Sequence, residues 1–320
     1  MYSSLVQRLE QLDQRARGAV LGVSRIGLGL LWLANLHWKV PPDFGQDNGG
    51  GLYKYSASVP RHSPFAPFTW VTEEIILPNF QFFGWVVLLG ETTLAMLLIV
   101  GYHTKLVALG GAMMTIPIML SVLYYDRADE WSWSYLLMLI AHLLVYASAA
   151  GDHLGLDGVL GRGSVAAHQS IRVVGVVAVV IGAAGLFVAR SVSFAGSQVA
   201  LLGSDAGFVN DDGKLIRRWE LKFVWFNPLW ALLTIALGVL VLAVRKQWAT
   251  RAAAIGFGAM AVVILVIQKF DYVRDDGSIQ IVATASNTAM WGALAIALLL
   301  AGRAAGDVDG HADELPLAKS

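Results

Sequence analysis

The chain has 320 residues, of which 56% are hydrophobic and 14% are charged, and its formal net charge is zero. Soluble domains usually carry about a quarter charged residues, so the composition favours a membrane protein, and the balanced charge gives no indication of a nucleic-acid partner. The chain has no cysteine. This excludes disulfides, thiolate zinc sites and iron–sulfur clusters held by its own thiolates.

Eight apolar stretches are long enough to predict transmembrane helices, because crossing about 30 Å of hydrocarbon takes about 20 apolar residues. They are residues 18–38, 79–101, 105–125, 133–150, 172–190, 227–245, 251–268 and 284–302. The mixed-charge segment before residue 18 is unlike a signal-peptide n-region, so we expect a retained first span. The predicted fold class is all-α, a polytopic membrane helix bundle of about eight transmembrane helices.

The spacing of the spans repeats once along the chain. Each half has one span, a long loop and three further spans with short links, which predicts two parallel four-helix halves with structured outer loops. The expected units are a four-helix domain at 1–165 with outer loop 39–78, a second at 166–304 with outer loop 191–226, and a tail at 305–320.

Charge and tryptophan placement predict an orientation. An even number of spans puts both termini on one side, and the links on that side, 102–104, 151–171 and 246–250, are richer in basic residues than the acidic link 126–132. The positive-inside tendency then makes both termini cytoplasmic, in a cell (inner) membrane. Most tryptophans fall at the opposite span ends, which suggests a structured outer cap where protein partners dock.

Three ionisable residues lie deep within predicted spans, where an unpaired charge is costly. At 1.5 Å per residue, Arg25, Glu91 and His142 lie about 10, 15 and 12 Å from the inner ends of their spans. They could form a buried Arg25–Glu91 ion pair with His142 hydrogen-bonded nearby, which fixes helix register. They could instead bind a polar headgroup or exchange protons, or not meet at all.

Two of these residues belong to helical stripes with steps of three and four residues. The stripes are Arg25, Leu28, Trp32, Asn35 and Lys39 on the first span, and Tyr135, Met138, His142 and Tyr146 on the fourth. The candidate catalytic residues are therefore Glu91, His142 and Arg25, and the candidate ligand-binding residues are Trp32, Asn35, Lys39, Tyr135 and Tyr146. His37 points away from the stripe and is expected at the surface, and Trp38 is interpreted as an interfacial stop.

Metal and phosphate motifs are weak. His142 is the only deeply placed histidine, and bis-histidine haem needs two, so neither haem nor a metal is expected. The segment "DHLGLD" (152–157) offers a poor ligand set, and the glycine-rich "DNGGGLYKY" lacks the lysine and helix context of a P-loop. Residues 207–226 resemble a turn followed by a short strand or an amphipathic segment. The charges at 269–276 are more typical of a solvated boundary than of a site.

Three segments of the first half resemble the DoxX family. They are "SRIGLGLLWLANLHWK", with an early arginine and a final lysine, "LGETTLAMLLIVGYHTKLVALGGAMM", with its acidic residue, and "GDHLGLDGVLG" after the fourth span. The resemblance covers about residues 18–160 and implies a small four-helix membrane protein similar to the DoxD subunit of thiosulfate:quinone oxidoreductase. It makes Arg25, Lys39 and Glu91 the positions that match recurrent family residues.

The resemblance implies a quinone-associated subunit of a membrane redox system, with a membrane quinone as its ligand. Protonated quinols need acid–base partners, a role that Glu91 and His142 could fill, with Trp32 as an apolar wall. Two alternatives stay open: a non-catalytic anchor or assembly subunit that docks a partner at the outer face, suggested by "WELKFVWFNPLW", and a small-molecule transporter. Whether the chain is an enzyme is not decided by its sequence.

Overall fold

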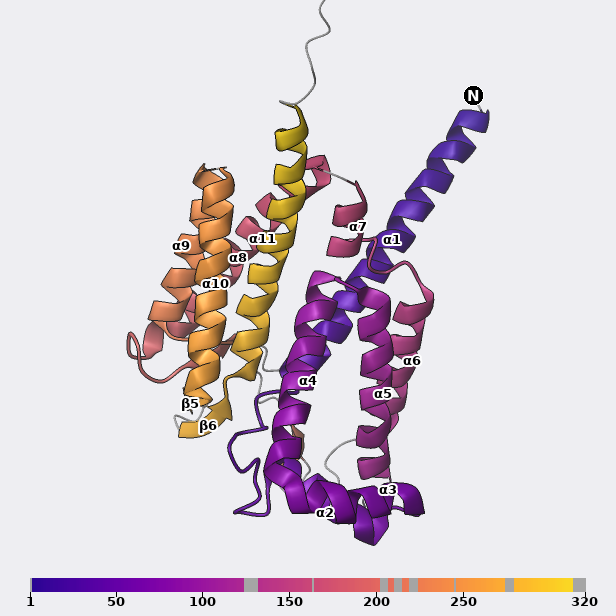
Figure 1. The fold of residues 1–320 in the computed structure, drawn as a ribbon, viewed down its shortest axis with the longest axis vertical. Helices are drawn as coiled ribbons and strands as arrows, with labels where there is room; N and C mark the ends of the chain where they lie inside the picture. The colour runs from indigo at the N-terminus through magenta and orange to yellow at the C-terminus, as the bar shows by residue number, and fades with distance from the viewer. Residues whose placement is uncertain are drawn as a thin grey trace, which may run out of the picture.

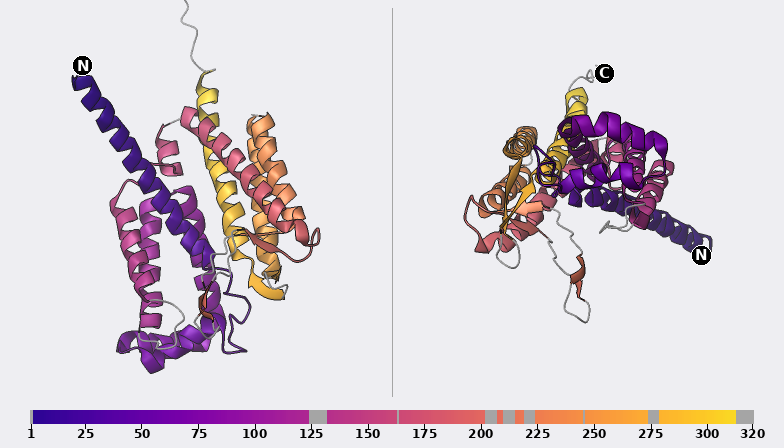
Figure 2. Two further views of the ribbon diagram at one scale, coloured as in Figure 1. Left: turned by 180° about the vertical axis from the view of Figure 1, so that it is seen from behind. Right: turned by 90° about the horizontal axis from the view of Figure 1, so that it is seen from below.

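The protein was analysed as a computed structural model, which describes residues 2–123, 132–162, 164–201, 207–209, 215–218, 224–244, 246–273 and 279–312. Most of these residues are helical, and the helices form two groups that lie side by side (Figures 1 and 2). The first group contains α1 (Tyr2–Ala34), α4 (Phe80–Val100), α5 (Thr104–Leu123) and α6 (Ser132–Ala147). The second contains α8 (Ser164–Val188), α9 (Pro228–Val244), α10 (Gln247–Ile267) and α11 (Ala285–Ala312), and α7 (Leu156–Arg162) lies between the groups in the chain.

Six helices of the described chain are long and apolar enough to cross a membrane, which confirms an all-α, multi-pass membrane protein. They cover Leu12–Ala34, Ala66–Val100, Thr104–Leu123, Ser164–Ser191, Gln247–Ile267 and Ala285–Gly306. The apolar helices Trp133–Ala147 and Pro228–Val244 are shorter, so the count of eight spans stays a prediction. Helix α11 continues to Ala312, which makes the first part of the expected tail helical.

The loop at 39–78 is largely helical and covers one end of the first helix group (Figure 1). It holds α2 (Gly51–His62), α3 (Ala66–Val71), the π-helical turn η1 (Thr72–Ile76) and the 3₁₀ turn η2 (Leu77–Asn79), which leads into α4. The tight turn before α2 depends on glycine, because Gly45 has φ of +90° and a Cβ there would collide with the Gly50 backbone. We call this end of the bundle the α2–α3 end.

The strands of the described chain form three antiparallel pairs, of which β5 and β6 lie at the corresponding end of the second group (Figure 1). β1 (Val199–Leu201) pairs with β4 (Val224–Phe226), β2 (Gly207–Val209) with β3 (Leu215–Arg218), and β5 (Lys269–Val273) with β6 (Ile279–Ala283). Of the charged residues at 269–276, Lys269 and Asp271 are described and both are exposed, as a solvated boundary predicts. They belong to a hairpin strand whose Tyr272 is buried against Trp225. Charged and apolar residues alternate in β5, which is the side-chain period of a β-strand. The charges of the segment obscured this strand pattern in the sequence.

The two helix groups contact each other mainly through α11, which packs against α4 as well as against α8 and α10. At the α2–α3 end, the amide of Ala283 in β6 donates to the carbonyl of His37, just after α1 (2.9 Å). The N-terminal end of α1 and the C-terminal end of α11 lie at the opposite end of the bundle (Figure 1). Residues 126–131 of the acidic link, on which the predicted orientation partly rests, lie outside the described residues.

Candidate functional site

A buried ion pair joins α4 to the chain just after α1. The Lys39 ammonium lies 2.8 Å from Glu91 Oε2, and the two side chains are 2% and 0% exposed. Glu91 lies in the middle of α4 on the face formed by Leu88, Leu94 and Leu98, which are also buried. The sequence predicted both residues as site candidates, but it did not predict that they pair.

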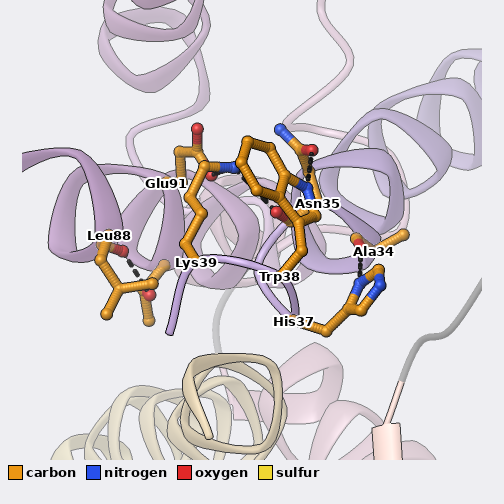
Figure 3. Close-up of polar contacts among 8 residues, drawn as sticks. Ala34, Asn35, His37, Trp38, Lys39, Leu88 and Glu91 are labelled. Atoms are coloured by element: carbon orange, nitrogen blue, oxygen red, sulfur yellow. Dashed lines mark hydrogen bonds and ion pairs between the residues drawn. The ribbon is translucent and has the colours of Figure 1, made fainter. Parts of the chain in front are cut away.

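Lys39 reaches Glu91 from a turn and not from a helical stripe, because α1 ends at Ala34. The Lys39 ammonium also donates to the carbonyl of Asn35 (2.8 Å) and lies 4.0 Å from the centroid of the Trp38 ring. Trp38 is held by its own hydrogen bond from Nε1 to Asn35 Oδ1 (2.9 Å). The turn therefore supplies a carbonyl and an aromatic face to the cation, both of which favour a buried ammonium. Figure 3 shows these side chains together beside α4.

A cavity of about 220 Å³ lies against this ion pair. Its polar lining includes Lys39, Glu91, Asn35 and Tyr135, and most of the remaining wall is apolar or aromatic. Helices α2, α4 and α5 and the α3–η1 segment provide that wall with Leu52, Tyr55, Ser56, Val59, Phe68, Thr72, Ile76, Phe83, Val86, Val87, Met114, Pro117, Ile118, Ser121 and Val122; Trp38 completes it. An apolar cavity with a few convergent polar groups is typical of a ligand site. We call it the Lys39–Glu91 cavity.

The sequence predictions missed the part of this wall that α2 contributes. The signal was present, because Leu52, Tyr55, Ser56 and Val59 follow the i, i+3, i+4, i+7 spacing of one helix face. The glycines before this segment favoured the prediction of a loop over that of a helix. Trp38 was assigned to the membrane interface alone, although its position next to Lys39 also suits a cation–π contact.

Arg25 does not pair with Glu91, so the predicted ion pair between them is wrong. Its guanidinium donates to the carbonyls of Leu98 and Ile99 at the end of α4, and to those of Ala150 and Leu154 in the link after α6. Leu98 is seven residues from Glu91, about 10 Å along the helix. The carbonyls that end α4 lack amide partners within the helix and attract a cation, which explains why Arg25 binds there.

Gly101 makes this arrangement possible. It ends α4 in the left-handed region with φ of +69°, and a Cβ on it would collide with the Arg25 guanidinium. Gly101 therefore caps the C-terminus of α4 and, because it has no side chain, leaves room for the Arg25 guanidinium. Arg25 acts here as a connector between α1, α4 and the link after α6.

His142 forms a separate polar contact in the core of the first helix group. Trp32 Nε1 donates to His142 Nε2 (2.9 Å), and both side chains are fully buried. The acceptor nitrogen carries no proton, so the proton of a neutral ring is on Nδ1, which has no hydrogen-bond partner among the described residues. Gly111 of α5 faces the ring, and a Cβ there would collide with it. Trp32 does not line the Lys39–Glu91 cavity, so its predicted role as a wall is not supported.

The remaining predicted residues divide between the cavity and the surface. Tyr135 is buried and lines the cavity, whereas Tyr146, at the other end of α6, is 44% exposed. The expectation that His37 lies at the surface is wrong, because its ring is buried and Nδ1 lies 2.8 Å from the carbonyl oxygen of Ala34. The centroids of the His37 and Trp225 rings are 5.9 Å apart. His37 points away from Lys39 (Figure 3) because it packs against the second helix group.

The aromatic residues of "WELKFVWFNPLW" that the structure describes mostly face inward. Trp225 and Phe226 are fully buried, and Asn287 holds the backbone of Trp225 through both its amide and its carbonyl (3.0 and 2.9 Å). Trp219 lies outside the described residues. Trp225 and Phe226 therefore pack the fold and are not available to a docking partner.

The segment "DHLGLD" has a structural role at the opposite end of the bundle. Both carboxylate oxygens of Asp157 accept backbone amides at the start of α5, from His103 (2.8 Å) and Thr104 (2.9 Å). A carboxylate in this position satisfies the unpaired amides of a helix N-terminus. Within the described part of the chain, no group of three histidine or acidic side chains is arranged to hold a metal ion.

Residues 52–181 match the family model described as the TQO small subunit DoxD, which confirms the resemblance to DoxX and DoxD-like proteins. No curated protein and no solved structure matches the chain significantly. The matched range starts in α2 and ends within α8, so it contains Glu91 and His142 but not Arg25 or Lys39.

Proposed function

We propose that this chain, DoxD-like over residues 52–181, is a quinone-associated subunit of a membrane redox system, and that the Lys39–Glu91 cavity holds the quinone ring. The observation that carries the proposal is a buried ion pair at the polar end of an otherwise apolar cavity. A bound quinone supplies the capacity to accept two electrons and two protons. Replacing a buried ion pair by apolar residues is often neutral or stabilising, so retaining one in a lipid-embedded core suggests a use beyond stability.

The residues fit such a ring chemically. The Lys39 ammonium can donate a hydrogen bond to a ring carbonyl, and the Glu91 carboxylate can accept one from a ring hydroxyl. Both groups are screened from water, where hydrogen bonds to charged groups are strongest. Apolar and aromatic side chains such as Tyr55, Phe68 and Phe83 provide faces for the ring.

The chain has no cysteine with which to hold an iron–sulfur cluster, and the proposal takes a partner protein as the source of the electrons. The matched family is described as a small subunit, which supports a partner in a larger complex. A purely structural anchor is the second candidate, also supported by that description. A pull-down in mild detergent should return a stoichiometric partner in either case. The double variant Lys39→Met/Glu91→Leu separates the two, because replacing both partners of a buried pair is often neutral for stability, so an anchor would keep its function.

Quinone binding can be measured on the purified chain in nanodiscs with a decyl-tailed benzoquinone. A hydrogen bond to a charged group contributes about 1.5–3 kcal/mol, so Lys39→Met should weaken binding roughly tenfold to a hundredfold. The matched control is Lys105→Met, which removes an exposed lysine at the other end of the bundle. Saturable binding with the same affinity in wild type and Lys39→Met, or no binding in wild type, would refute the proposed site.

A further inference from the structure

The Lys39–Glu91 cavity has a side that faces outward between α4 and α5. Val86 of α4 lines the cavity and is also 50% exposed, and Pro117 of α5 lines it and is exposed too. Both residues belong to segments long and apolar enough to cross a membrane. In a membrane-spanning arrangement of these segments, both exposed side chains face hydrocarbon rather than water.

Helices α4 and α5 lie closer together at their joined end than toward the α2–α3 end. They are joined by the short turn at residues 101–103, and they separate toward α2 and α3 (Figure 1). At Gly90 the Met114 side chain fills the space between the helices, since a Cβ on Gly90 would lie 3.1 Å from Met114 Cε. One helical turn further on, Val86 and Pro117 take the place of this close contact at the cavity wall.

Other elements close the cavity at the α2–α3 end. Tyr55 and Val59 of α2 and Thr72 of η1 lie over it, and Val59 and Thr72 are 2% and 1% exposed. The Thr72 hydroxyl donates to the carbonyl of Phe68 (2.8 Å), so it is satisfied within this cover. Among the lining residues, all of which the structure describes, Val86 and Pro117 are the exposed ones, so a ligand dissolved in the bilayer can approach the cavity between α4 and α5.

The size of the cavity limits what it can enclose. Pockets for drug-sized ligands measure about 300–1,000 Å³, and this cavity measures about 220 Å³. A single ring and a short length of chain fit this volume, but a long hydrocarbon tail does not. A ligand with such a tail must leave part of it outside.

We infer that the gap at Val86 and Pro117 is a lateral portal, through which the tail of a single-tailed amphiphile extends into the bilayer while its ring lies at Lys39 and Glu91. The inference rests on the proposed function and adds the direction of access and the class of ligand, a ring with a long hydrocarbon tail. The portal gives Val86 a role in ligand access that Leu89, on the same helix, does not share.

The absence of cysteine makes a direct test possible, because each introduced cysteine is unique in the chain. Val86→Cys and the control Leu89→Cys are one helical turn apart on α4, with native side chains 50% and 47% exposed, and only Val86 lines the cavity. Their rates of reaction with a lipid-soluble maleimide are measured in nanodiscs, with and without the decyl-tailed benzoquinone. At a ligand concentration about tenfold above its Kd, about nine-tenths of the sites are filled, so labelling at Val86→Cys should slow about tenfold and that at Leu89→Cys should not change.

A tailless benzoquinone bound to the same occupancy should leave Val86→Cys fully reactive, because its tail is missing from the gap. Equal reactivity of Val86→Cys with and without the bound decyl analogue would overturn the portal while leaving the proposed function intact, since binding is measured on the same sample. Protection of both cysteines would overturn it as well, because it would show a general change of the α4 surface. Failure of both benzoquinones to bind would instead remove the proposed function on which the portal rests.

Discussion

The Lys39–Glu91 ion pair predicts a double-mutant cycle with a large coupling. Removing one partner of a buried pair leaves an uncompensated charge and costs about 3–5 kcal/mol, whereas replacing both by apolar residues is often neutral or stabilising. The 2.8 Å contact and the 2% and 0% exposure place this pair in that class. Lys39→Met and Glu91→Leu should each lower the free energy of unfolding by about 3–5 kcal/mol, while the double variant should stay near wild type.

The assay is thermal unfolding in detergent, followed by tryptophan fluorescence, for which the chain has 11 tryptophans. Each single variant should lose roughly 4–8 °C in Tm, from an unfolding entropy of about 2.1 cal/mol/K per residue, and the double variant should recover most of this loss. The exposed Asp13–Arg17 pair is the control (2.6 Å, 56% and 76% exposed), since surface pairs contribute about 0–1 kcal/mol. A double variant whose loss equals the sum of the single losses would refute the pairing of Lys39 with Glu91.

Two further predictions concern the groups that hold the first helix group together. Gly111→Ala should lower Tm because its Cβ collides with the His142 ring, at a cost of about 1–3 kcal/mol for overpacking. Gly110→Ala is the control and should be neutral or stabilising, because the nearest side-chain atom to its Cβ is 3.9 Å away. Equal losses of Tm in the two variants would contradict this packing. Arg25→Met should make the link at 149–154 more sensitive to limited proteolysis, because several buried carbonyls lose their donor, and Arg25→Lys should restore part of the protection. Unchanged cleavage of Arg25→Met would show that the guanidinium does not hold this link.

The positions of the membrane helices could be predicted because bilayer thickness fixes the length of an apolar run. The predicted span 79–101 and the helix Phe80–Val100 agree within a residue at each end, and Gly101 marks the stop by itself. The buried face of α1 was also predictable, since Arg25, Leu28 and Trp32 share a helical stripe and are all buried. The spans at the edges were less well placed, because α11 continues past its apolar run on helix-forming residues.

Partners of the charged residues could not be predicted. Depth estimates put Arg25, Glu91 and His142 at a similar level, but an error of one turn moves a group by about 5.4 Å, which is larger than any hydrogen bond. The partners of Arg25 are backbone carbonyls, which every residue has, so no pattern of side chains in the sequence identifies them.

The sequence by itself determined where the long apolar helices lie, which residues of α1 share a buried face, and the resemblance to DoxD. The tertiary structure decided that Lys39 and not Arg25 meets Glu91, that α2 and the α3–η1 segment cover a cavity, and that His37 packs against the second helix group. The physical reason is that burial follows from the local spacing of apolar residues. A contact between charges depends instead on the offset and tilt of separate helices, which are set by the packing of the whole bundle.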